Sequence, residues 1–161
     1  MVPIVLWLIM VGWDSFADRM IALVLLVLAA STDGIDGAIA RKRNLVTNLG
    51  KILDPIADKA LLSGALVVLS IQGAVPWWAT IAILVREFGI TVYRLIVAKR
   101  KVIAASGGGK FKTVIQIIGV SMALAPFEAL GSWWVWLTQA VIWFAVVITW
   151  YTGVQYLRPQ K

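Results

Sequence analysis

The chain has 161 residues, of which 61% are hydrophobic and 14% charged, with a net charge of +7 and a mean hydropathy of +0.89. Soluble domains average about 45–50% apolar and about 25% charged residues, so this composition excludes an ordinary soluble domain and predicts an integral membrane protein. The chain contains no cysteine and no histidine, which excludes disulfides, thiolate nucleophiles and imidazole bases, and leaves oxygen ligands that favour hard cations such as magnesium, manganese or calcium.

Six apolar blocks follow one another along the chain, separated by glycine, proline or charged residues. None shows the two-residue alternation of a membrane β-strand, and a helix needs about 20 residues to cross a bilayer core of about 30 Å. We therefore predict an all-α fold, a polytopic membrane protein with six transmembrane helices in one domain of residues 1–161. The blocks lie at residues 2–13, 20–40, 52–71, 76–98, 111–127 and 133–157.

The first block is short for a membrane span. Met1 leads almost directly into apolar sequence, without the positive segment and small-residue cleavage site of a signal peptide. We interpret this block as a short first helix.

Basic residues gather at alternate ends of the predicted helices. If the loops at 41–51 and 99–112 are cytoplasmic, both termini are cytoplasmic too, and the outer loops retain only Arg19 of the fifteen basic residues. This asymmetry follows the positive-inside rule. The predicted location is therefore the plasma (inner) membrane, and the positive charge reflects topology, with no nucleic-acid partner.

Polar residues interrupt the end of the second block. At helical spacing, Asp33, Asp36, Gly37, Ala40 and Arg41 share one face. Carboxylates inside membrane helices are costly to bury and indicate a functional site. The two small residues allow a polar headgroup to approach the backbone, and an arginine can bind a phosphate with two hydrogen bonds.

A matching face follows on the third block, where Gly50, Asp54 and Asp58 repeat every four residues. If the two faces turn toward each other, four carboxylates meet, and they need cations or protons to share a pocket. A pair of divalent ions would neutralise them and leave coordination sites for a phosphate. Helix packing and capping are the alternative. They can explain Asp54 before Pro55, but not four aspartates on two matched faces.

Together these residues resemble the signature of the CDP-alcohol phosphatidyltransferase family, D-x2-D-G-x2-A-R-x8-G-x3-D-x3-D. The resemblance extends to nearly the whole chain. Residues 86–94 and 110–116 are similar to the branch of the family that makes phosphatidylglycerophosphate. The fixed positions of the signature are all present, as Asp33, Asp36, Gly37, Ala40, Arg41, Gly50, Asp54 and Asp58.

The resemblance implies a six-helix fold, often a homodimer, with a polar cavity open to the cytoplasmic side. It implies that CDP-diacylglycerol and glycerol-3-phosphate react to phosphatidylglycerophosphate and CMP among membrane lipids. Two Mg²⁺ or Mn²⁺ ions would be held by Asp33, Asp36, Asp54 and Asp58, and Asp58 would also be the general base. The residues that would line the CDP-lipid site are Asp33, Gly37, Ala40, Arg41 and Gly50.

Family members usually begin with an amphipathic segment that carries an N-P-N/T-x-L-T-like stretch and an arginine. The sequence has no such stretch before its first apolar block. We expect this N-terminal juxtamembrane segment to be short or missing.

An acceptor that carries a phosphate requires a second basic patch. Arg86 and Arg94 lie about 80° apart around the fourth predicted helix, and Lys112, Thr113 and Gln116 share a face of the fifth. Alternatively, the lysines only obey the topology rule and contact anionic lipid, and Glu87 pairs with one of the arginines. The predicted acceptor-phosphate residues are Arg86, Arg94, Lys110, Lys112, Thr113 and Gln116.

Two other functions compete with this interpretation. A related enzyme that uses inositol phosphate, serine or phosphatidylglycerol as acceptor would keep the same carboxylate site. A membrane cation transporter would also place carboxylates in helices, but near the midplane and with access from both sides. Here the carboxylates straddle a basic loop that faces water, which favours the enzyme.

Overall fold

The structure is a computed structural model that describes the backbone of residues 2–42, 48–97 and 108–157, and the side chains of residues 2–32, 59–93, 111–128 and 130–155. Over this part of the chain it contains six α-helices, one short 3₁₀ helix and no strand, which confirms the predicted all-helical class. The elements are α1 (Val2–Val11), α2 (Phe16–Lys42), α3 (Asn48–Ile71), α4 (Trp77–Val97), α5 (Gly108–Leu124), η1 (Glu128–Leu130) and α6 (Ser132–Leu157).

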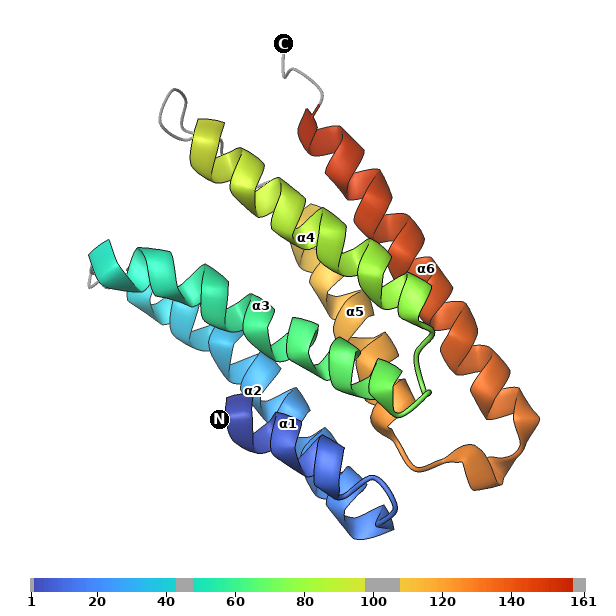
Figure 1. The fold of residues 1–161 in the computed structure, drawn as a ribbon. Helices are drawn as coiled ribbons and strands as arrows, with labels where there is room; N and C mark the ends of the chain where they lie inside the picture. Colours follow the sequence, from blue (N-terminus) through green and yellow to red (C-terminus); the bar gives the residue numbers. More distant parts are fainter. Residues whose placement is uncertain (1, 43–47, 98–107, 158–161) are drawn as a thin grey trace.

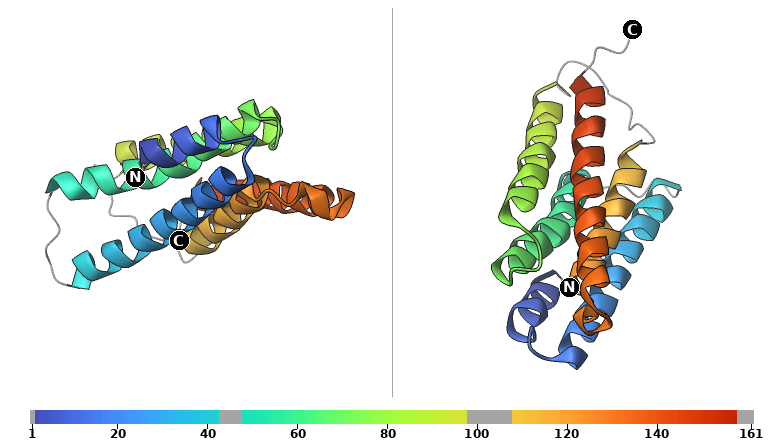
Figure 2. Two further views of the ribbon diagram at one scale, coloured as in Figure 1. Left: turned by 90° about the horizontal axis from the view of Figure 1, so that it is seen from below. Right: turned by 90° about the vertical axis from the view of Figure 1, so that its right-hand side faces the viewer.

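The helices form two layers. Helices α1, α3 and α4 make one layer, and α2, α5 and α6 make the other (Figure 2). Within the layers α3 packs on α1 and α4, and α5 packs on α2 and α6, while the layers meet through α1–α2, α3–α5 and α4–α6 contacts. Every helix thus has neighbours in both layers.

The helices run between the two ends of the bundle, so their own ends lie there (Figure 1). The α1–α2, α3–α4 and α5–α6 connections lie at one end, here called the turn end (Figure 1). The C-terminal ends of α2, α4 and α6 and the N-terminal ends of α3 and α5 lie toward the opposite end (Figure 1). The C-terminal ends of α2 and α4 thus lie on the same side of the bundle, as expected. Which side of a membrane they face stays a prediction.

The short first helix of the prediction is present as α1, which spans 10 residues. At a rise of about 1.5 Å per residue it covers about 15 Å, half of a bilayer core. It packs on α3 at Gly64, where an added Cβ atom would lie 2.5 Å from the Cδ1 atom of Leu6. Val5 and Ile9 are fully buried. Apolar packing therefore stabilises α1 on the bundle, and the absence of a side chain at Gly64 allows Leu6 to approach α3 closely.

The outward faces of the helices are apolar instead of polar. On α4 the exposed stripe consists of Ile81, Val85, Phe88 and Val92. Such stripes on an isolated soluble protein would expose large contiguous apolar patches to water, which monomers rarely do. On α6 the exposed stripe consists of Trp136, Trp143, Val147, Trp150 and Val154. The apolar exterior is what a lipid environment requires.

By length and composition, Ser132–Gln155 is the one helix among the described residues that could cross a membrane, and 39% of its most apolar stretch is buried. The shorter apolar helices are Val2–Val11, Lys59–Ile71 and Phe111–Leu124. One such helix is weak evidence alone, because core helices of soluble proteins pass the same test. The six predicted spans therefore remain a prediction.

A buried arginine closes the turn end. Arg19 of α2 donates hydrogen bonds from Nε to the carbonyl of Leu124 and from Nη2 to that of Ala125, both at 3.0 Å. Nη2 also bonds the carboxylate of Glu128 at 2.6 Å, and the guanidinium lies 4.2 Å from the ring centroid of Trp13. The last carbonyls of a helix have no partner within it, so Arg19 satisfies the end of α5 and ties it to α2.

We predict that Arg19→Met lowers the free energy of unfolding by about 2–3 kcal/mol, because two carbonyls lose hydrogen bonds from a charged donor. Glu128→Gln should lower it by less than about 1 kcal/mol, because that side chain is half exposed. Unfolding of the purified protein in detergent micelles measures both. Equal stability of the Arg19→Met variant and the wild type would contradict the assigned role.

Candidate functional site

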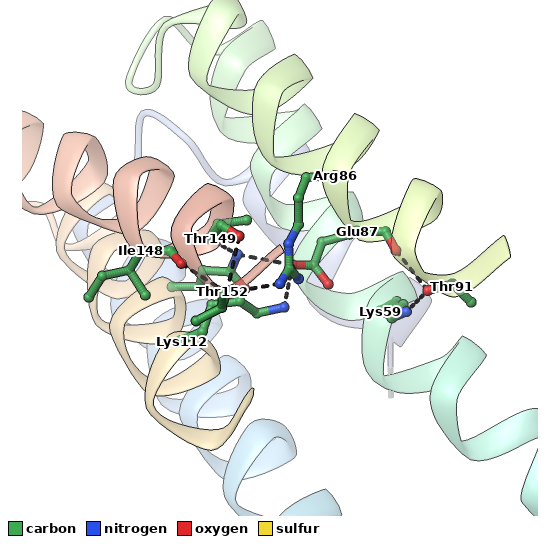
Figure 3. Close-up of polar contacts among 9 residues, drawn as sticks. Lys59, Arg86, Glu87, Thr91, Lys112, Ile148, Thr149 and Thr152 are labelled. Carbon is green, nitrogen blue, oxygen red and sulfur yellow. Dashed lines mark hydrogen bonds and ion pairs between the residues drawn. The ribbon is translucent and has the colours of Figure 1, made fainter. Parts of the chain in front are cut away.

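Among the described side chains, the carboxylate of Glu87 is the centre of a buried polar network between α4, α5 and α6. The Oε1 atom of Glu87 accepts a hydrogen bond from Nη1 of Arg86 at 3.0 Å and one from Nζ of Lys112 (Figure 3). The amide nitrogen of Gln116 approaches the same oxygen at 3.5 Å. All four residues are buried, and a buried charge is tolerated only when it is paired and hydrogen-bonded.

The partners of Glu87 are themselves fixed by threonines of α6. Arg86 donates from Nη2 to the hydroxyl of Thr152 at 2.8 Å, and Gln116 donates to the hydroxyl of Thr149 at 2.9 Å. The hydroxyl of Thr152 donates in turn to the carbonyls of Ile148 and Thr149 (Figure 3). An arginine on α4 and a glutamine on α5 are thereby held by hydroxyls of α6.

A lysine of α3 completes the network. Nζ of Lys59 donates to the hydroxyl of Thr91 on α4 (Figure 3). The same hydroxyl donates to the backbone carbonyl of Glu87 at 2.7 Å. Lys59 is therefore attached to the same turns of α4 that carry Arg86 and Glu87.

A glycine on α6 makes room for Arg86. A Cβ atom at Gly153 would lie 2.9 Å from Nε and 3.3 Å from Cγ of Arg86. Nε is buried and has no hydrogen-bond partner among the described residues, which is uncommon for a buried donor. The guanidinium is therefore placed by its Nη atoms, and its Nε lies against bare backbone.

A cavity of about 100 Å³ lies beside this network. Its apolar wall is formed by Leu62, Leu66 and Ile83. Two of its wall residues are lysines, so the cavity can attract an anion. Its polar wall is formed by Lys59, Ser63, Glu87, Lys112, Thr113 and Gln116.

A larger cavity of about 260 Å³ lies at the turn end. Its wall includes Trp13, Gln72, Glu128 and Trp134 but no lysine or arginine. A phosphorylated substrate needs positive charge, so the smaller cavity is the better candidate for such a ligand despite its size.

The structure brings together four of the six residues predicted to bind an acceptor phosphate. Arg86, Lys112 and Gln116 meet at Glu87, and Thr113 lines the adjacent cavity with two of them. The side chains of Arg94 and Lys110 lie outside the described residues. The alternative that Glu87 pairs with an arginine is correct, because Glu87 pairs with Arg86. Glu87 also pairs with Lys112.

The side chains of the predicted carboxylate site, residues 33–58, also lie outside those that the structure describes. The backbones of the two helices that carry these aspartates are described. Asp33 and Asp36 belong to α2, and Asp54 and Asp58 belong to α3. These helices contact each other, and their two aspartate-bearing ends lie toward the same end of the bundle (Figure 1). Among the described side chains, no group of three or more Asp, Glu, His or Cys could hold a metal ion.

Sequence reasoning missed the α6 side of the network. Thr149 and Thr152 are buried, and their spacing puts both on one face of the helix. The sequence does contain a signal for them, because both threonines interrupt an apolar block and polar side chains in a membrane helix commonly hydrogen-bond across helices. Lys59, which directly follows Asp58, was not among the predicted acceptor-phosphate residues.

Comparison with known proteins gives consistent matches. A sequence profile of the CDP-alcohol phosphatidyltransferase family matches residues 1–151. The chain is 40% identical over 158 residues to the probable phosphatidylglycerophosphate synthase of Mycobacterium tuberculosis, covering 98% of this chain and 74% of that protein. It is 44% identical over 137 residues to the CDP-diacylglycerol–glycerol-3-phosphate 3-phosphatidyltransferase of Bacillus subtilis, covering 83% and 69%. The protein of that name from Rickettsia bellii is 37% identical over 152 residues, covering 92% and 83%.

The packing of Arg86 on α6 gives a test of the network. Gly153→Ala should lower the free energy of unfolding in detergent by about 1–3 kcal/mol, because the new methyl group overlaps a buried guanidinium. Gly89→Ala on α4 is the matched control, since nothing lies within 4 Å of its added Cβ and alanine favours a helix. If both variants were equally stable, Arg86 would not lie against Gly153.

Proposed function

The chain belongs to the CDP-alcohol phosphatidyltransferase family, and on this premise we propose that it transfers the phosphatidyl group from CDP-diacylglycerol to glycerol-3-phosphate, with release of CMP. It is a transferase of phospholipid biosynthesis, like the relatives named for this reaction. One observation carries the choice of a phosphorylated acceptor. The cavity between α3, α4 and α5 has Lys59 and Lys112 in its wall, and Lys59 directly follows Asp58.

The proposed metal ligands are the four aspartates of α2 and α3, Asp33, Asp36, Asp54 and Asp58. The family generally depends on divalent metal ions, and we propose two, either Mg²⁺ or Mn²⁺. The donor set fits such ions, because carboxylate oxygens are hard ligands. Bound there, the ions would neutralise the carboxylates and stabilise the charge on the pyrophosphate of the donor lipid.

The remaining polar residues of the motif would bind the donor lipid. Gly37, Ala40 and Gly50 have small or no side chains, which allows the cytidine diphosphate group to approach the helix backbones. Arg41 supplies planar, charged donors for a phosphate. With Asp33, these residues form the proposed CDP-lipid site.

In the proposed reaction Asp58 accepts the proton of the acceptor hydroxyl. The hydroxyl oxygen attacks the phosphorus on the lipid side of the pyrophosphate, and the bond between this phosphorus and the oxygen of CMP breaks. CMP leaves with the electron pair, and the proton passes from Asp58 to water. A carboxylate is a reasonable base here, because the chain has no histidine.

The acceptor phosphate would bind at the basic cavity. Lys112, Thr113 and Gln116 form part of its wall, and Arg86 is bound to the same carboxylate as Lys112. Arg94 and Lys110 complete the proposed set on α4 and α5. Ammonium, guanidinium, hydroxyl and amide groups can all donate hydrogen bonds to phosphate oxygens.

The protein is associated with a membrane, as its family and its apolar helix indicate. We further propose that residues 1–161 form one membrane domain with six spans in the plasma (inner) membrane. The carboxylate site and both termini would face the cytoplasm, as the distribution of basic residues favours. A homodimer is proposed from the family resemblance.

The function is tested by measuring CMP release from CDP-diacylglycerol with a panel of acceptors. We expect release with glycerol-3-phosphate that requires Mg²⁺ or Mn²⁺ and stops when a chelator is added. Serine, inositol phosphate and phosphatidylglycerol should support at most about a hundredth of this rate, a difference of about 2.7 kcal/mol in transition-state binding. Preference for one of these three would assign the chain to another acceptor.

The role of the general base is tested by Asp58→Asn. Because asparagine cannot accept the proton, the turnover number should fall by at least about 10³-fold at saturating Mg²⁺. Asp14→Asn is the matched control, since Asp14 is exposed between α1 and α2, and it should keep wild-type turnover. Substantial activity of the Asp58→Asn variant would exclude Asp58 as the base.

A further inference from the structure

We propose that Glu87 is a positioning residue that holds Lys112 in the wall of the acceptor cavity and thereby sets the preference for a phosphorylated acceptor. This inference rests on the proposed function. It adds a residue that would not bind the substrate anion itself, because a carboxylate repels a phosphate. Its effect would act through the cations that it holds.

The geometry makes Glu87 an anion shared by two cations. Arg86 and Lys112 come from different helices and both donate to Oε1 of Glu87. Two buried like charges so close would repel each other strongly in a medium of low dielectric constant. The carboxylate between them removes this repulsion, and without its charge Lys112 would turn away from Arg86.

The two cations differ in what else holds them. Arg86 is anchored to α6 through Thr152 and packs against Gly153. Lys112 has a flexible stem with three donors on its ammonium group, and the cavity wall contains both Lys112 and Glu87. One donor bonded to Glu87 is compatible with donation by the others to a phosphate in the cavity. Lys112 is therefore the cation whose position depends most on Glu87.

The charges also match the ligand. Arg86 and Lys112 carry two positive charges and Glu87 one negative charge when all are ionised, and Lys59 adds a further ammonium group to the cavity wall. A phosphate monoester carries about −1.5 to −2 near pH 7, so these cations favour its entry. Glycerol, which has the same hydroxyls but no phosphate, would gain nothing from these charges.

Glu87→Gln tests the proposal, because glutamine keeps the shape of the side chain and removes its charge. The Michaelis constant for glycerol-3-phosphate should rise at least about tenfold, which corresponds to about 1.4 kcal/mol. That for CDP-diacylglycerol should change less than about twofold. The preference for glycerol-3-phosphate over glycerol, measured as the ratio of kcat/KM, should fall at least about tenfold.

Glu128→Gln is the matched control, because it makes the same chemical change in another ion pair with an arginine, at the turn end. Arg19→Met serves as a control for loss of stability. Neither variant should change the preference for glycerol-3-phosphate over glycerol. A change in preference in these variants equal to that of Glu87→Gln would show that destabilisation alone produces the effect and would overturn the proposal.

Glu87→Asp covers the case in which the glutamine variant does not fold. Its carboxylate keeps the charge but is one methylene shorter, so it should retain the fold and raise only the Michaelis constant for glycerol-3-phosphate. An unchanged preference in this variant, or equal effects on donor and acceptor, would overturn the proposal. Failure of the wild type to release CMP with glycerol-3-phosphate would instead refute the proposed function, before any variant is compared.

Discussion

A carboxylate in the interior of a helix bundle must find all its partners within the protein, because no bulk water is present to solvate it. Glu87 meets this constraint with donors from its own helix and from α5. Those donors are then fixed by hydroxyls of α6. The requirement to solvate one anion thus constrains how α4, α5 and α6 face one another, in addition to their apolar packing.

The number and the approximate bounds of the helices could be predicted from apolar blocks separated by breaks. The differences have physical reasons. Helix α2 begins at Phe16, earlier than its apolar block, because a polar residue such as Arg19 can remain helical when partners elsewhere solvate it. Helix α3 also begins early, at Asn48. The partners themselves could not be predicted. Glu87 and Lys112 are distant in sequence, and nothing in local periodicity specifies which face of α5 turns toward α4. The carboxylate face of residues 33–58 could be predicted from the spacing of its aspartates along the sequence. Its side chains, however, lie outside the described part of the structure.

The two ends of the bundle differ in chemistry. At the turn end, Arg19 satisfies the last carbonyls of α5 and is covered by Trp13, so charge there serves to fasten helices. Toward the other end, lysines line a cavity and the helices carry the aspartates of the family signature. The charge of Arg19 is satisfied by groups of the protein itself, whereas the lysines of the proposed site line a cavity that a ligand can enter.

The adjacency of Arg86 and Glu87 in the chain also bears on how the protein enters a membrane. Their ion pair lies within one helix, so α4 carries its own counter-charge into the membrane, whereas Lys112 belongs to the next helix. A neutral pair is less costly to transfer into lipid than either charge alone. Helix α5 then follows with a lysine whose anion is already in place. For this cluster, the order of the residues along the chain thus places the anion before the lysine that pairs with it.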